Sequence, residues 1–155
     1  MDMNVLKSLK NKLNELQIEI DNLLLEKKYC LNVYTEIPKK SEPCLYIDYF
    51  GDVEHFFWND TDVNKKFYEN NIIFKDKQSA ETYKELRQDM KKLNKKFVFE
   101  EDNYALRFSP VYNEVIIGFR GDFNYDCYYY TEEDARYILD KYGQNVLKNY
   151  ILYCK

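Results

Sequence analysis

Glycine, proline and histidine are scarce in this chain of 155 residues, which has four glycines, three prolines and one histidine. With so few glycines, a glycine-rich phosphate-binding loop is excluded, and no GxGxxG, GxxxxGK[ST] or GxSxG motif occurs. The histidine, His55, has no histidine or cysteine beside it in the sequence, so it fits neither a zinc site nor a catalytic triad. We therefore expect no enzymatic activity, no cofactor and no metal.

Closely spaced cysteines and long apolar runs are also missing. The four cysteines form no CxxC pair, which excludes zinc-knuckle and thioredoxin spacings and favours reduced, structural thiols. No run of about 18 apolar residues occurs, and residues 1–12 contain no continuous apolar segment. We therefore expect neither a membrane-spanning helix nor a signal peptide, and a cytoplasmic location.

Aromatic residues, in contrast, are abundant, with 16 tyrosines and 10 phenylalanines. They supply enough apolar surface for the chain to fold, and its length suits one core. The formal net charge of −4 argues mildly against broad nucleic-acid binding. Charge is unevenly distributed, because residues 42–62 contain six acids and no lysine or arginine, whereas residues 84–96 contain six bases and two acids.

A leucine-rich stripe in residues 1–30 predicts a helix suited to pairing. Its members are Leu6, Leu9, Leu13, Leu16, Ile20 and Leu23. Their spacing of 3, 4, 3, 4 and 3 residues is the a/d alternation of a coiled coil. So short a helix is marginal alone and needs a partner. Two partners are possible: a second copy, giving a homodimer, or a helix between Tyr83 and Phe97 that repeats the spacing.

The rest of the chain predicts an α+β domain. Residues 31–43 are expected to be a linker, because Pro38 and Pro43 break regular structure among polar residues, and residues 44–155 are expected to be the domain. Strands are expected at 44–50, 53–58, 72–74, 104–109, 114–119 and 125–130. Helices should begin after the capping residues Asp76 and Thr131, and Gly143 should end the second. The fold class is α+β, a coiled-coil-like N-terminal helix and then antiparallel strands with helices on one face, in two strand-strand-strand-helix units.

Acidic turns and clustered rings provide the candidate binding surface. Rings occur on both faces of the strands at 53–58 and 125–130, so either both faces are covered or a ring-rich patch is exposed to a partner. The candidate partner-binding residues are Asp48, Asp52, Glu54, Trp58, Asp60, Asp62 and Tyr128. The alternatives are core packing for the rings and solvated turns for the acids.

The order of these features resembles that of small proteins from phages and prophages of Gram-positive bacteria. The residues that carry the resemblance are 47–53, 58–62, 71–74, 80–81 and 131–135, together with the leucine stripe. They form a turn and two helix caps, so they bear on the fold and imply no catalytic residue. Asn70-Asn71 stands where such proteins usually have Gly-Asn, a change that turn geometry tolerates.

The resemblance implies a phage-encoded inhibitor of a bacterial defence system, similar in kind to anti-CRISPR proteins and acting in the host cytoplasm. Its acids would stand in for nucleic-acid phosphates and bind a basic host defence protein stoichiometrically. Two alternatives remain. The chain could be a sponge for a defence-signalling nucleotide, with tyrosines stacking on bases and Arg107 or Arg120 binding phosphate, or a nucleic-acid accessory protein that uses the basic helix at 84–96.

Overall fold

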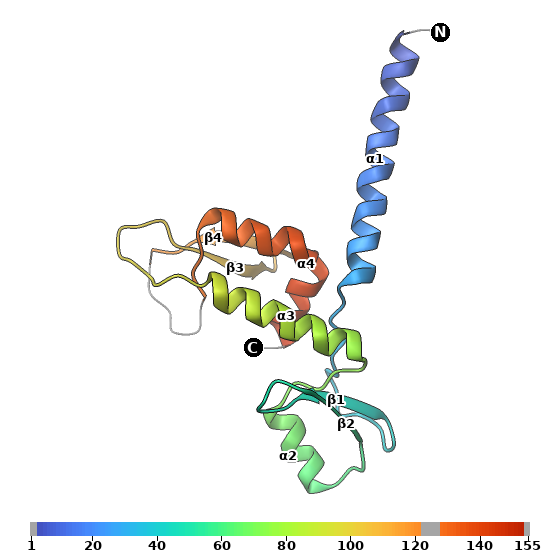
Figure 1. Cartoon of the computed structure of the whole chain (residues 1–155), viewed down its shortest axis with the longest axis vertical. Coiled ribbons are helices and arrows are strands. Elements are labelled where there is room, and N and C mark those ends of the chain that lie inside the picture. The colour runs from blue at the N-terminus through green and yellow to red at the C-terminus, as the bar shows by residue number, and fades with distance from the viewer. Residues whose placement is uncertain (1–2, 122–127, 154–155) are drawn as a thin grey trace.

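The computed structural model describes residues 3–121 and 128–153 of the chain, and it confirms the α+β class (Figure 1). Helix α1 comes first, and two groups of strands and helices follow it. The elements are α1 (Met3–Lys28), β1 (Pro43–Ile47), β2 (Val53–Phe57), α2 (Asp62–Asn70), α3 (Lys77–Leu93), β3 (Tyr104–Ser109), β4 (Glu114–Phe119) and α4 (Glu132–Tyr153).

Each group contains an antiparallel hairpin, a bridging residue and then a long helix. Leu45 of β1 pairs with Phe74, which lies just before α3, and Tyr104 of β3 pairs with Tyr130, which lies just before α4. The two groups therefore share one order of pairing, as the sequence predicts. Within the described residues the expected third strands are bridges only, and residues 125–127 of the second one lie outside them.

Side chains of β1 alternate between two apolar clusters. Leu45 and Ile47 pack in the main core, whereas Cys44 and Tyr46 pack in a smaller cluster around Trp58. Helix α2 closes the smaller cluster with rings at Phe67 and Tyr68, and it begins where the Thr61 side chain accepts a hydrogen bond from the Asn64 amide. Helix α2 therefore covers the face of the hairpin that carries Phe56 and Trp58, whereas Phe57 on the other face is 65% exposed.

The main core lies where α3 packs against α4. Tyr83, Leu86 and Met90 of α3 are buried together with Ile138 and Tyr142 of α4. Each helix also covers its own hairpin, α3 over β1–β2 and α4 over β3–β4. Both predicted caps are present, because the side chains of Asp76 and Thr131 accept hydrogen bonds from the amides of Ser79 and Asp134.

The segment predicted as a linker, residues 31–43, is packed in its first part. Leu31 and Val33 are buried, Val33 pairs with Phe74, and the Asn32 amide donates to the Ser79 hydroxyl at 2.8 Å. Apolar side chains at alternate positions make this stretch part of the body instead of a free connection. Its packing holds the C-terminal end of α1 at the body.

A half-buried polar network also joins α3 to α4. The Lys141 ammonium contacts the Asp89 carboxylate at 2.6 Å and that of Glu85 at 2.8 Å, and the Tyr142 hydroxyl donates to Asp89 at 2.9 Å. Burial raises the pKa of Asp89, but hydrogen bonds from Lys141 and Tyr142 outweigh it, so the pKa of this carboxyl lies below its usual value.

We expect Asp89→Ala to lower the free energy of unfolding by about 1–3 kcal/mol, because Lys141 and Tyr142 lose a half-buried acceptor. A lowered carboxyl pKa adds stability above the unfolded-state value of about 3.9, and this stability disappears as the pH falls through the folded value. Urea unfolding measured between neutral and acidic pH should therefore show a weaker acid dependence in Asp89→Ala.

Arg136→Ala is the control, since its i,i+4 ion pair with Glu132 is exposed on both sides. Its cost should stay below about 0.5 kcal/mol. Equal losses for the two variants would contradict the structural role of the network.

Candidate functional site: exposed surfaces of α1 and of the β1–β2 turn

The leucine stripe of α1 is exposed along the middle of the helix. The exposed fractions are 55% for Leu9, 69% for Leu13, 57% for Leu16 and 49% for Ile20. Figure 1 shows α1 extending away from the body as a separate helix, and among the described residues its contacts with other elements are to α4. The side chains of Leu6 and Leu23 lie outside those that the structure describes. We call the four exposed residues the seam.

The possible internal partner of the seam, helix α3, packs its apolar face against other elements. Tyr83, Leu86 and Met90, which repeat the heptad-like spacing, are buried in the main core against α4. Helix α3 therefore presents its apolar face to the body, and no contact between α1 and α3 occurs in the described part of the chain. The internal partner that the sequence allows therefore does not cover the seam in the described part of the chain.

The β1–β2 turn carries the other exposed apolar feature. Strand β1 ends at Ile47 instead of continuing to residue 50, because an Asp48 carboxylate oxygen accepts from the Asp52 amide at 2.8 Å and closes the turn early. Gly51 within it has a φ of 88°. Tyr49 and Phe50 therefore lie in the turn, outside the strand pairing of β1 with β2.

These residues, Tyr49 and Phe50, are 97% and 85% exposed. Their rings meet edge to face at 5.7 Å between centroids. The carboxylates of Asp52 and Glu54 are exposed beside them. We call Asp48, Tyr49, Phe50, Asp52 and Glu54 the acidic turn. Tyrosine is enriched among the residues that contribute most to binding a partner, so this turn is the candidate binding surface.

The predicted partner-binding residues do not form one surface. Trp58 is 0% exposed and belongs to the smaller cluster, so its prediction as a surface residue is wrong. Asp60 and Asp62 lie beyond the opposite end of β2 from the acidic turn. Asp60 pairs with Lys65 at 3.2 Å, and Asp62 lies in the first turn of α2, where its charge offsets the helix dipole.

Tyr128 is half-buried and packs against the main core, so it too is a poor candidate for a surface anchor. Tyr49 and Phe50 were missed as anchors because aromatic residues favour strands, and the sequence reads as a continuous strand up to Phe50. The Gly51-Asp52 turn signal beside them was the clue that they could be exposed.

Some of the basic side chains at 84–96 make contacts within the folded chain. Arg87 lies over the Tyr83 ring and donates to its hydroxyl at 3.1 Å, and the Lys95 ammonium donates to the Asp102 carbonyl at 2.7 Å. Glu85 and Asp89 on the same helix bind Lys141. Structural contacts therefore account for part of the charge at 84–96.

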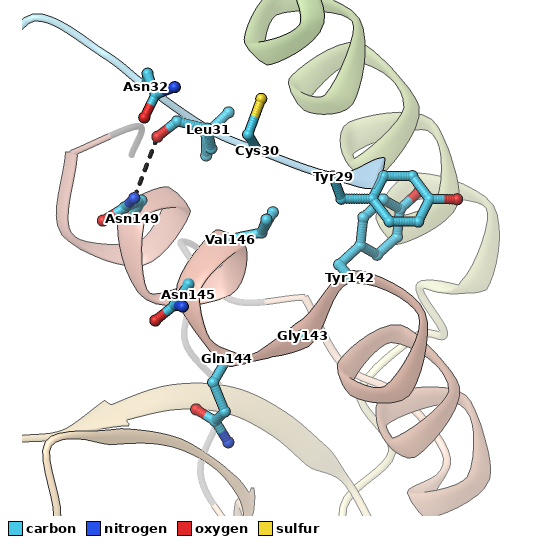
Figure 2. A pocket seen from close by; sticks show the side chains of 10 residues that line it. All are labelled: Tyr29, Cys30, Leu31, Asn32, Tyr142, Gly143, Gln144, Asn145, Val146 and Asn149. Carbon is cyan, nitrogen blue, oxygen red and sulfur yellow. Dashed lines mark hydrogen bonds between the residues drawn. The ribbon is translucent and has the colours of Figure 1, made fainter. Parts of the chain in front are cut away.

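A pocket of about 460 Å³ lies where the chain passes from α1 to the body (Figure 2). Residues 29–32 form one side, and α4 forms the other at Gly143, whose φ of 78° and ψ of 168° break the helix there. Only glycine readily adopts this combination. Tyr29 packs on Tyr142, with 5.0 Å between ring centroids.

Polar groups of this pocket serve the fold. Gln144 donates to the Val115 carbonyl and accepts from its amide. Asn149 donates to the Leu31 carbonyl, a bond that Figure 2 draws. Burial raises the pKa of the nearby Cys30 thiol. The pocket is therefore best described as the joint that attaches α1 to the body.

The described residues contain no cluster of three or more histidine, cysteine or acidic side chains that could hold a metal ion. No described helix is both long and apolar enough to cross a membrane. No protein-family model, curated protein or solved structure matches the chain.

Gly143→Ala should lower the free energy of unfolding by about 1–3 kcal/mol, because alanine is strained at this positive φ. Thermal or urea unfolding would measure it. Gly121→Ala is the control, since Gly121 has no positive φ and a Cβ there would meet its nearest neighbour at 3.7 Å, an ordinary contact. An unfolding curve unchanged by Gly143→Ala would contradict the assigned strain.

Proposed function

We propose that this chain is a non-catalytic inhibitor that binds a basic bacterial defence protein through the acidic turn and assembles as a homodimer through α1. The observation that carries the binding role is the pair of exposed rings, Tyr49 and Phe50, beside exposed carboxylates. The phage resemblance of the sequence supplies the class of partner. A location in the host cytoplasm belongs to the same proposal.

The chemistry of the acidic turn suits a basic protein surface. Rings at the tip can fill apolar pockets, while Asp52 and Glu54 can accept charge-assisted hydrogen bonds from arginine or lysine. Proteins that bind nucleic acid have arginine and lysine side chains on the binding surface. The carboxylates beside the rings can therefore occupy positions on such a protein where phosphates would bind. Electrostatic attraction of this kind weakens with added salt.

The dimer is supported by the seam. Four large apolar side chains on one stripe of a projecting helix are costly to leave in water, and burial of each is worth about 1.5–3 kcal/mol. A second copy offers the same stripe. Pairing of two copies covers both seams at once and supplies the packing that an isolated helix lacks.

Replacing Leu13 and Leu16 together by Glu should weaken the dimer by at least about a hundredfold, because two charges would be buried at the pairing face. Sedimentation equilibrium of the full chain would then give the monomer mass of 18.9 kDa. The double control Asn11→Glu and Asn14→Glu adds the same charge to the same helix off the seam and should leave the dimer intact. A wild-type chain that stays monomeric would contradict the proposal.

The binding role can be tested with a panel of purified CRISPR effector complexes and their target DNA. We expect inhibition of cleavage that saturates at a fixed molar ratio and weakens as salt is raised. Replacing Tyr49 and Phe50 together by Ala should weaken inhibition by about tenfold or more, because hot-spot anchors are lost. Asp52→Lys with Glu54→Lys should also weaken it and reduce its salt dependence.

The β3–β4 turn provides a matched control. Val111 and Tyr112 are 85% and 70% exposed at the tip of the other hairpin, so replacing both by Ala removes a similar apolar area. Inhibition should not change. If the two alanine pairs had equal effects, or if no effector in the panel were inhibited, the assignment of the acidic turn to these partners would be refuted.

A further inference from the structure

We propose that two copies of α1 pair antiparallel, with Leu13 of one copy opposite Leu16 of the other. This inference rests on the homodimer proposed above and specifies its geometry. The apolar positions alone allow two arrangements, and the charged residues beside them distinguish between the two.

The apolar positions are symmetric about the midpoint between Leu13 and Leu16. In an antiparallel pair centred there, Leu13 faces Leu16, Leu9 faces Ile20, and by sequence Leu6 faces Leu23 of the other copy. A parallel pair in register also stacks these positions, each on its own counterpart. Parallel two-stranded coils favour β-branched residues at the a positions, which here are Leu6, Leu13 and Ile20, so only one of the three fits.

The residues flanking the seam favour the antiparallel pair. Lys12 and Glu19 occupy g positions, and Lys10 and Gln17 occupy e positions. In antiparallel coils g faces g, so Lys12 of each copy lies opposite Glu19 of the other, which gives two ion pairs related by symmetry. In parallel coils g faces e, so Lys12 lies opposite Gln17 and Glu19 has no basic neighbour across the interface.

Both charges are available for this contact. Lys12 and Glu19 are exposed, and neither takes part in the ion pairs formed within the described part of the chain. The neighbouring Gln17 donates to Asp21 along the same helix at 2.9 Å. The antiparallel pair therefore matches opposite charges without breaking any ion pair within one chain.

The arrangement separates the two bodies. Each body begins after Lys28, and residue 28 of one copy would lie level with residue 1 of the other. At a rise of 1.5 Å per residue, the bodies would be about 40 Å apart along the helix axis. A parallel pair would instead place two bodies of net charge −4 side by side.

Charge exchange across the interface tests the orientation. Lys12→Glu alone, and Glu19→Lys alone, each replace two attractions by two repulsions, so each should weaken the dimer of the full chain by about tenfold. The double variant K12E/E19K should restore the dissociation constant to within about twofold of wild type. Lys7→Glu makes the same change of charge at a position that does not flank the seam, so it should leave the dissociation constant unchanged.

Distances between spin labels give an independent readout. Ser8 and Glu15 occupy the same heptad position, so a parallel pair predicts equal label-to-label distances at the two sites. The antiparallel pair brings the labels at residue 15 level and separates those at residue 8 by about 20 Å along the axis. Attaching the labels through a non-natural amino acid avoids the four native cysteines.

The outcomes distinguish the antiparallel arrangement from the homodimer proposal on which it rests. A monomer at every concentration would overturn the homodimer itself. A dimer with equal distances at residues 8 and 15, or one in which K12E/E19K fails to recover, would overturn the antiparallel arrangement and leave the homodimer in place. Rescue together with unequal distances supports both.

Discussion

The packing of α3 against α4 is the contact on which the rest of the structure depends. Tyr83, Leu86 and Met90 enter the main core there, and the network around Asp89 fixes the two helices at the same interface. Because both hairpins rest on these helices, the interface also positions β1–β2 relative to β3–β4. It has a further consequence, since an apolar face buried against α4 is no longer available to α1.

Local signals in the sequence accounted for most of the elements and for the α+β class. The hairpin at 104–109 and 114–119 has the predicted bounds, and Asp76 and Thr131 cap helices because their side chains satisfy amides of the first turn. Tertiary partners were harder to predict. The stripes of α1 and α3 have the same spacing, and only the folded core shows that α3 is buried and α1 exposed.

The candidate site also shows that tertiary contacts are harder to predict from the sequence than local structure. Trp58 reads as an interface residue because its strand has rings on both faces, yet α2 covers the second face. Tyr49 and Phe50 have the sequence pattern of strand residues, yet hydrogen bonds of Asp48 with Gly51 and Asp52 end the strand before them. In both places local contacts decide whether a ring lies in the core or at the surface, and the spacing of hydrophobic residues alone does not specify those contacts.

The seam of α1 and the acidic turn have different consequences for binding. The distance between the two acidic turns of a dimer decides whether one partner can contact both. An antiparallel α1 pair would place one acidic turn in each body, with the bodies held apart by the length of the helix. Two linked sites increase affinity only when a partner offers two matching sites within reach, because otherwise the second site adds no effective concentration. A single-site partner would therefore bind each body independently, two per dimer. On such a partner, under the proposed function, α1 would contribute to assembly and the affinity would come from the acidic turn.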